Sequence, residues 1–268
     1  MSAGSLQFRL QTLTRLHNLL PSKIAWKRLG YASHMSVPER PEFAMSTLAP
    51  SLPLIRSTFE DTIAKHGGSV RETFETDDRL IMRATLLRAD DVTEGDTVNA
   101  GVAIRCAGAT LEVHPYVFRQ VCRNGQIAAQ SVASIRISRC AEWRTSDASD
   151  VLIDMVQAVN QCAMGDAFPD SVNEMRAAAV TPGTMDMLLS LLPLLPSLSE
   201  HPEITRAIMN QYAAGEDDSV FGILNAITAT ARDTEDPEMK WSLEELGAGV
   251  PAWLLRMPSW DQRQHPVR

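Results

Sequence analysis

The segment Val113–Arg139 combines residue types that bind phosphate groups. It contains four arginines and no carboxylate, although the chain of 268 residues carries a net charge of −8. A guanidinium matches the oxygens of a phosphate, and backbone amides beside Asn124 and Gly125 can add an anion-binding nest. Tyr116 and Phe118 offer rings on which unpaired bases can stack. The residues predicted to bind nucleic acid are Arg119, Arg123, Asn124, Gly125, Arg136, Arg139 and Tyr116.

A structural interpretation of the same segment stays open. In it, Phe118 belongs to the core and the arginines pair with some of the 33 Asp and Glu residues of the chain. An acidic protein repels nucleic acid unless its charges are separated in space. The prediction of a binding surface therefore requires that the arginines lie together and are not neutralised one by one.

The first 38 residues form a second basic segment, with five Lys and Arg residues and no Asp or Glu. Leucines near helical spacing predict a basic amphipathic helix there. Three interpretations remain: an arm that binds nucleic acid or a membrane surface, a transit-like peptide, or an extension upstream of a functional start at Met35.

Clustered carboxylates raise the alternative of a metal-dependent nuclease. Glu75, Asp77 and Asp78 precede a predicted strand, and a second acidic group lies in the turn "ADDVTEGD", where Asp and Gly are favoured for conformational reasons. The four cysteines form no C-x-x-C pair and the six histidines match no metal-binding frame. We therefore predict no metal site and no cofactor, and a protein without catalytic residues.

The surrounding pattern predicts an α+β fold, in which an antiparallel sheet with a short helix is followed by a mainly helical C-terminal half. A helix precedes Gly67 and Gly68, and two strands flank the acidic turn as a hairpin. The segment "PYVFRQVCRNG" is predicted as the short, arginine-bearing helix, with Pro115 at its start. A strand follows in "SVASIRISR", and helices begin near Ser149.

These elements suggest four regions. They are a basic arm or extension (1–38), an α+β sheet region (45–145), a helical region that extends the same domain or forms its own (149–258), and a polar tail (259–268). The most apolar run, Met185–Leu198, is too short to span a membrane and is interrupted by Pro193 and Pro196.

Two short motifs resemble the phage/plasmid-like protein family known as domain of unknown function 932. In "FRQVCRNGQI" the matching residues are Arg119, Cys122, Asn124 and Gly125. In "SVFGILNAITATARD" they are Phe221, Asn225, Ala226 and Thr228. The resemblance implies a protein of a mobile element, a setting that fits the handling or annealing of single-stranded DNA.

The leading prediction is thus a cytoplasmic homo-oligomer that binds single-stranded nucleic acid without catalysing a reaction. The first alternative is a protein-interaction module of a phage or plasmid element, docking through Met185–Leu198 and the basic arm. The second is the nuclease described above.

Overall fold

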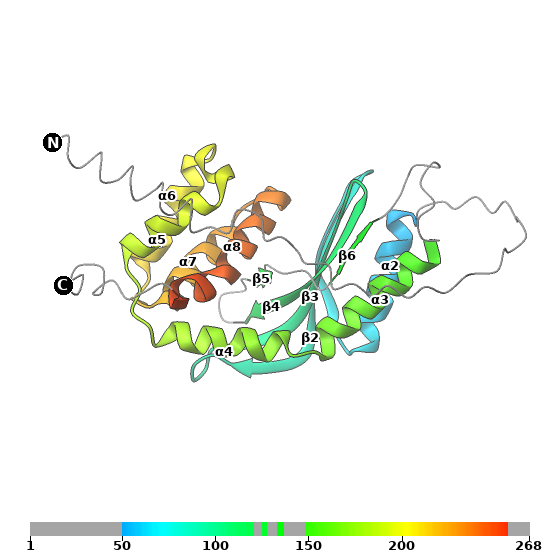
Figure 1. The fold of residues 1–268 in the computed structure, drawn as a ribbon, viewed down its shortest axis with the longest axis horizontal. Coiled ribbons are helices and arrows are strands. Elements are labelled where there is room, and N and C mark those ends of the chain that lie inside the picture. The colour runs from blue at the N-terminus through cyan, green and yellow to red at the C-terminus, as the bar shows by residue number, and fades with distance from the viewer. Residues whose placement is uncertain (1–49, 121–124, 128–132, 137–147, 257–268) are drawn as a thin grey trace, which may run out of the picture. The chain divides into compact units, whose positions relative to one another are not determined.

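The computed structural model describes residues 50–120, 125–127, 133–136 and 148–256. All of them belong to one compact unit, Ser46–Arg268. The predicted α+β architecture is confirmed, since an antiparallel sheet with a helix before it leads into a mainly helical C-terminal half (Figure 1). The basic arm and the polar tail lie outside the described residues.

Helix α2 spans Leu52–Lys65, as its sequence predicts. Ile55, Phe59 and Ile63 recur at helical spacing and are all buried. The helix ends where Gly67 takes a positive φ of 69° and the Gly68 amide donates to the Ile63 carbonyl at 3.0 Å.

Within the described residues, six strands form one antiparallel sheet. Strands β1 to β4 are neighbours in chain order, and β5 and β6 both pair with β4, on different stretches of it. The predicted hairpin around the acidic turn is confirmed as β2 and β3. The strand bounds are Ser69–Glu75 (β1), Arg79–Asp91 (β2), Thr97–Ala107 (β3), Thr110–Arg119 (β4), Gly125–Ile127 (β5) and Ala133–Arg136 (β6).

The short helix predicted from Pro115 onward is wrong, because this stretch continues strand β4 as far as Arg119. Residues 113–117 are buried without a break, so the polar–apolar alternation that reveals a half-exposed strand is missing. Pro115 also suggested a helix start. In the sheet it lies between the residues paired with β6 (Thr110–Val113) and those paired with β5 (Tyr116–Phe118), where a missing N–H is tolerated.

The sheet is covered on both faces. Alternate residues of β2 and β3, such as Met82 and Val102, join the main core with α2 and α3. The residues between them, such as Ile81 and Ala103, form a smaller core with Trp241 of helix α8. Figure 1 accordingly shows α2 and α3 on one side of the sheet and α8 on the other.

The helical half contributes α8 and the helices that pack against it. In its leucine-rich run, Leu188, Leu191, Leu192 and Leu198 are buried in the core, whereas Leu189 is exposed. Among the described helices, none combines the length and apolar character needed to cross a bilayer. The bounds are Ala148–Met164 (α3), Ala167–Ala179 (α4), Met185–Leu191 (α5), Leu192–Leu194 (η1), Pro196–Ser199 (η2), Pro202–Ala214 (α6), Val220–Arg232 (α7) and Pro237–Arg256 (α8).

Candidate functional site

A groove of about 760 Å³ opens between the second face of the sheet and the ends of α7 and α8. Four cationic and two anionic side chains line the groove. Its lining residues are Arg71, Glu72, Arg83, Asn99, Tyr116, Phe118, Gln120, Gly125, Arg232, Lys240 and Glu244.

A β-bulge brings two charged residues of β1 to this face. The pairing of β1 with β2 shifts register between Val70 and Glu72, so the usual alternation of side chains is interrupted at Arg71. Arg71 and Glu72 are neighbours in sequence, yet both line the groove.

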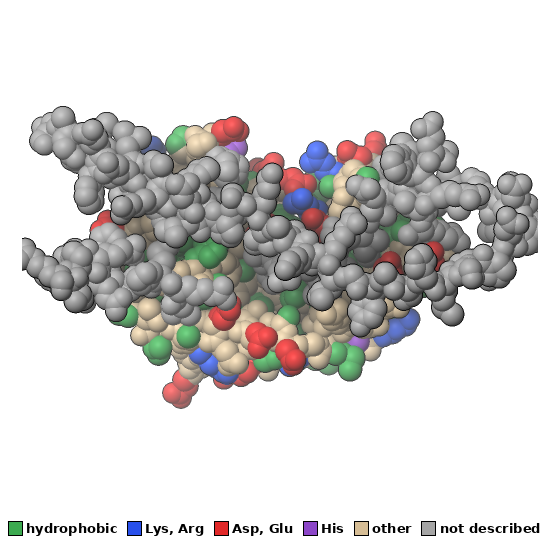
Figure 2. Space-filling view, in the orientation of Figure 1, with side chains coloured by type: hydrophobic (Ala, Val, Ile, Leu, Met, Phe, Trp, Pro, Cys, Tyr) green, Lys and Arg blue, Asp and Glu red, His purple; other side chains and the backbone are tan. Residues whose placement is uncertain are grey.

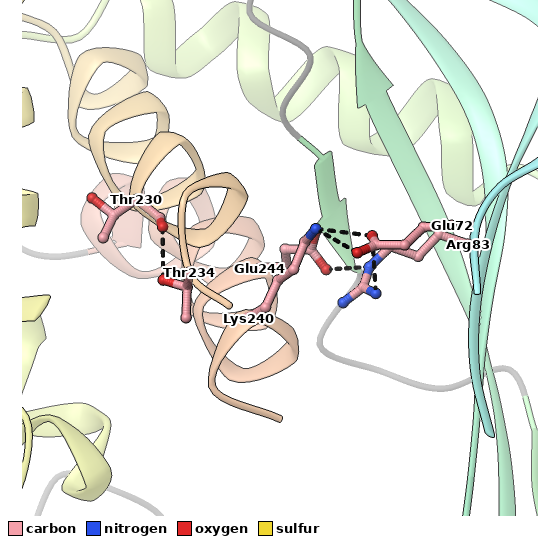
Figure 3. Close-up of polar contacts among 6 residues, drawn as sticks. All are labelled: Glu72, Arg83, Thr230, Thr234, Lys240 and Glu244. Carbon is pink, nitrogen blue, oxygen red and sulfur yellow. Dashed lines mark hydrogen bonds and ion pairs between the residues drawn. The ribbon is translucent and has the colours of Figure 1, made fainter. Parts of the chain in front are cut away.

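The turn between α7 and α8 positions the start of α8, which forms the wall of the groove opposite the sheet. The Thr234 hydroxyl donates to the Thr230 carbonyl at 2.8 Å (Figure 3). The Asp236 carboxylate accepts from the Met239 amide at 2.6 Å, and Pro237 begins the helix, two features that favour a helix start. Lys240 and Glu244, one turn apart, are thereby directed at the sheet.

The floor of the groove is an ion-pair network (Figure 3). Arg83 Nε donates to Glu244 Oε2 at 2.7 Å, and both side chains are only 2% exposed. Glu72 bridges the two cations: it lies 2.8 and 2.9 Å from Lys240 Nζ and 3.4 Å from Arg83 Nη1. Arg83 Nη2 is buried and has no hydrogen-bond acceptor among the described residues.

Trp241 lies beneath this network and is fully buried. The guanidinium carbons of Arg83 and Arg105 each lie 5.6 Å from its ring centroid, and the His114 ring meets it edge-on at 5.3 Å. Burial and cation–π attraction therefore fix α8 against the sheet and hold the Arg83 side chain in place.

Burial changes the protonation of two groove residues. It raises the pKa of Glu244 to about 7, against the opposing effect of Arg83 and Lys240. It also raises the pKa of Tyr116, whose phenol therefore stays neutral. Near neutral pH Glu72 and a partly ionised Glu244 thus face Arg71, Arg83 and Lys240, while the fourth cation, Arg232, pairs with Asp233 at 2.7 Å.

Arg71 and Phe118 form the mouth of the groove. The Arg71 guanidinium lies 5.5 Å from the centroid of the half-buried Phe118 ring, and its Nε donates to the Thr85 hydroxyl at 2.8 Å. No described carboxylate pairs with Arg71, so its positive charge is not neutralised locally. Beside it, Gln120 and Asn99 are joined by an amide–amide hydrogen bond of 2.6 Å.

Arg119 is the one predicted arginine whose side chain is described, and this side chain makes internal contacts. Its Nε lies 2.6 Å from Asp96 Oδ1, its guanidinium carbon lies 5.2 Å from the Phe221 ring centroid, and the side chain is 19% exposed. Its charge is therefore matched by a neighbouring carboxylate, as the structural interpretation expects.

Tyr116 and Gly125 do line the groove, but in different roles from those expected. The Tyr116 ring is buried, so it offers no face to a base. Gly125 begins β5 and has no positive φ; a methyl group there would overlap the Tyr116 hydroxyl. Arg123, Asn124, Arg139 and the Arg136 side chain lie outside the described residues.

Two of the carboxylates suggested for a nuclease have other partners. Glu75 pairs with Arg56 at 3.0 Å, and Asp78 accepts from the Thr76 hydroxyl at 3.0 Å. Within the part of the chain that the structure describes, no three His, Cys, Asp or Glu residues are placed to hold a metal ion. The nuclease alternative thus gains no support from these residues.

The two motifs that carry the resemblance meet in space, about 100 residues apart in sequence. Arg119 and Gly125 from the first motif, and Phe221, Asn225 and Thr228 from the second, line one small cavity of about 10 Å³. A comparison of this chain with protein-family models, with curated proteins and with solved structures found no match.

Two cationic residues of the groove escaped prediction from sequence. Arg71 and Lys240 come from β1 and α8, and the contact between Glu72 and Lys240 joins residues 168 positions apart. Each stands among carboxylates in sequence, so neither belongs to an acid-free segment. On the face drawn in Figure 2, acidic and basic side chains are interspersed over the described surface.

Proposed function

We propose that this protein binds single-stranded nucleic acid in the groove and catalyses no reaction on it. The observation that carries the proposal is Arg71, whose positive charge has no described carboxylate partner and which lies over Phe118 at the mouth of the groove. The three further cations of the groove, Arg83, Lys240 and Arg232, are paired with Glu244, Glu72 and Asp233. A cationic groove follows a phosphate backbone, and an aromatic ring beside it stacks a base.

A single strand fits this arrangement better than a duplex. In a duplex the bases are already stacked and cannot reach a half-buried ring, whereas an unpaired base can lie on Phe118 or on the Arg71 guanidinium. The amides of Asn99 and Gln120 stand next to this platform and offer polar groups to a base edge.

The setting in a mobile element is part of the same proposal. It rests on the resemblance to the phage/plasmid-like family, and it is supported by the convergence of the two motifs on one cavity. A cytoplasmic location and self-association into a homo-oligomer remain predictions.

The test is a titration of labelled oligo(dT) at low salt, followed by fluorescence anisotropy. We expect Arg71→Glu and Phe118→Ala each to weaken binding by about tenfold, and we expect added salt to weaken the wild type. Arg56→Glu is the matched control, since Arg56 lies on α2 and is paired with Glu60 and Glu75. Equal losses for Arg71→Glu and Arg56→Glu, or no binding by the wild type, would refute the proposal.

A further inference from the structure

Glu72 stands where an anionic ligand of the groove would bind. Its carboxylate takes two contacts from Lys240 Nζ, at 2.8 and 2.9 Å, and a longer one of 3.4 Å from Arg83 Nη1 (Figure 3). The two cations come from different walls, β2 and α8, and converge on this one carboxylate.

Exposure differs sharply within the network. The side chain of Glu72 is 42% exposed, whereas those of Lys240 and Arg83 are 16% and 2% exposed. An ion pair with one solvent-exposed partner is weak, because water competes for the carboxylate and the side chain gains freedom when released. The buried cations have no such freedom, so opening the contact moves Glu72 and leaves Lys240 and Arg83 in place.

The position left by Glu72 would be cationic. Two positive groups would then face Glu244 alone, and the buried Arg83 Nη2 still has a donor without an acceptor among the described residues. Uncompensated charge in a partly buried site is unfavourable, so the site favours another anion.

We propose that Glu72 occupies a phosphate subsite in the free protein, and that a phosphate group of the ligand replaces it between Lys240 and Arg83. The part of this inference that concerns nucleic acid rests on the proposed function; the subsite itself requires only a phosphate group. Glu72 then acts as an internal competitor that lowers the affinity of every ligand that uses the subsite.

Phosphate suits the subsite better than the carboxylate of an acidic peptide. A guanidinium presents its donors as a fork that two phosphate oxygens can accept at once, and a third oxygen remains for the Lys240 ammonium. The groove is large enough for the attached sugar and base, and Phe118 and Arg71 line the same groove.

The test compares Glu72→Gln with Glu75→Gln. Both remove one carboxylate from β1, but Glu75 pairs with Arg56 on α2 and lies outside the groove lining. Isothermal titration calorimetry with inorganic phosphate, thymidine monophosphate and thymidine should show about tenfold tighter phosphate and nucleotide binding for Glu72→Gln. Thymidine binding should not change, and Glu75→Gln should match the wild type. Lys240→Met should lower the affinity of both phosphate ligands.

The outcomes separate the subsite from the proposed function. If Glu72→Gln and Glu75→Gln bind phosphate and nucleotide equally, the subsite is refuted, even if oligo(dT) binds. If Glu72→Gln gains affinity for the small phosphates while oligo(dT) does not bind, the subsite holds and the nucleic-acid function fails. An equal gain for a poly-glutamate peptide would contradict the assignment to phosphate. Thermal unfolding of each variant confirms that the fold is retained.

Discussion

The Arg83–Glu244 pair shows how a residue used for structure can also prepare a binding site. A buried ion pair gains attraction but loses hydration, and the two effects nearly cancel. For Glu244 the loss of hydration outweighs the attraction to Arg83, since burial raises the pKa of Glu244 to about 7. Arg83 remains charged whether or not Glu244 is protonated. The groove floor therefore becomes more cationic as the pH falls through the pKa of Glu244.

This pKa predicts a dependence of stability on pH. In the unfolded chain Glu244 titrates near 4.5, and in the folded protein near 7. Between these values the folded state holds a proton that the unfolded state has lost, so stability decreases as pH rises through the window, by about 2–3 kcal/mol. Glu244→Gln should remove this decrease.

Urea unfolding of both proteins at several pH values from below 5 to 8 measures the effect. The difference between wild type and Glu244→Gln isolates Glu244 from the other ionisable groups, which are the same in both proteins. Glu94→Gln, in the exposed hairpin turn, is the control and should behave as the wild type does. A constant difference between Glu244→Gln and wild type across this range would show that the pKa is not raised.

At the scale of elements, the contact of β4 with β5 depends on one glycine. The Tyr116 phenol of β4 lies directly against Gly125. We expect Gly125→Ala to destabilise the protein by about 1–3 kcal/mol, because the added methyl must displace a buried ring. Denaturant unfolding measures the cost.

Gly215→Ala is the control for this substitution. Gly215 has an ordinary φ of −73°, and its nearest neighbour to an added methyl lies at 3.4 Å, so we expect a change within about 0.5 kcal/mol. Equal effects of the two substitutions would mean that β5 does not pack on Tyr116 as described.

The same region shows which elements a sequence can predict. Helix α2 and the β2–β3 hairpin were predictable, because Gly67 stops a helix and the turn before Asp96 is rich in Asp and Gly. Strand β4 was not, because both of its faces are buried and Pro115 imitates a helix start. Local signals therefore fail where a strand is enclosed by tertiary structure.

At the scale of the whole molecule, the groove exists only because α8 returns to the sheet. Phe118 could be singled out from its segment, but its partners could not. Glu72, Arg83 and Lys240 come together through the bulge in β1 and the packing of α8, and neither leaves a local pattern. The acid-free segment includes Tyr116 and Phe118 of β4, which line the groove, whereas the exposed charge of Arg71 beside them comes from β1.

Trp241 provides the test of this long-range arrangement. It is fully buried between α8 and the sheet, so Trp241→Ala should cost about 3–5 kcal/mol. Because Arg83 also stacks on this ring, the variant should lose affinity for inorganic phosphate even under conditions where it remains folded. Trp253→Ala, on the same helix but 40% exposed, should cost less than about 1 kcal/mol.

Denaturant unfolding followed by far-ultraviolet circular dichroism and by tryptophan fluorescence measures both variants. Since α3 and α8 pack on opposite faces of one sheet, the two probes should report a single coincident transition in the wild type. Separate transitions, or similar costs for Trp241→Ala and Trp253→Ala, would mean that α8 is not held on the sheet. The groove between them would then have no fixed second wall, and a phosphate could not be held between Lys240 and Arg83.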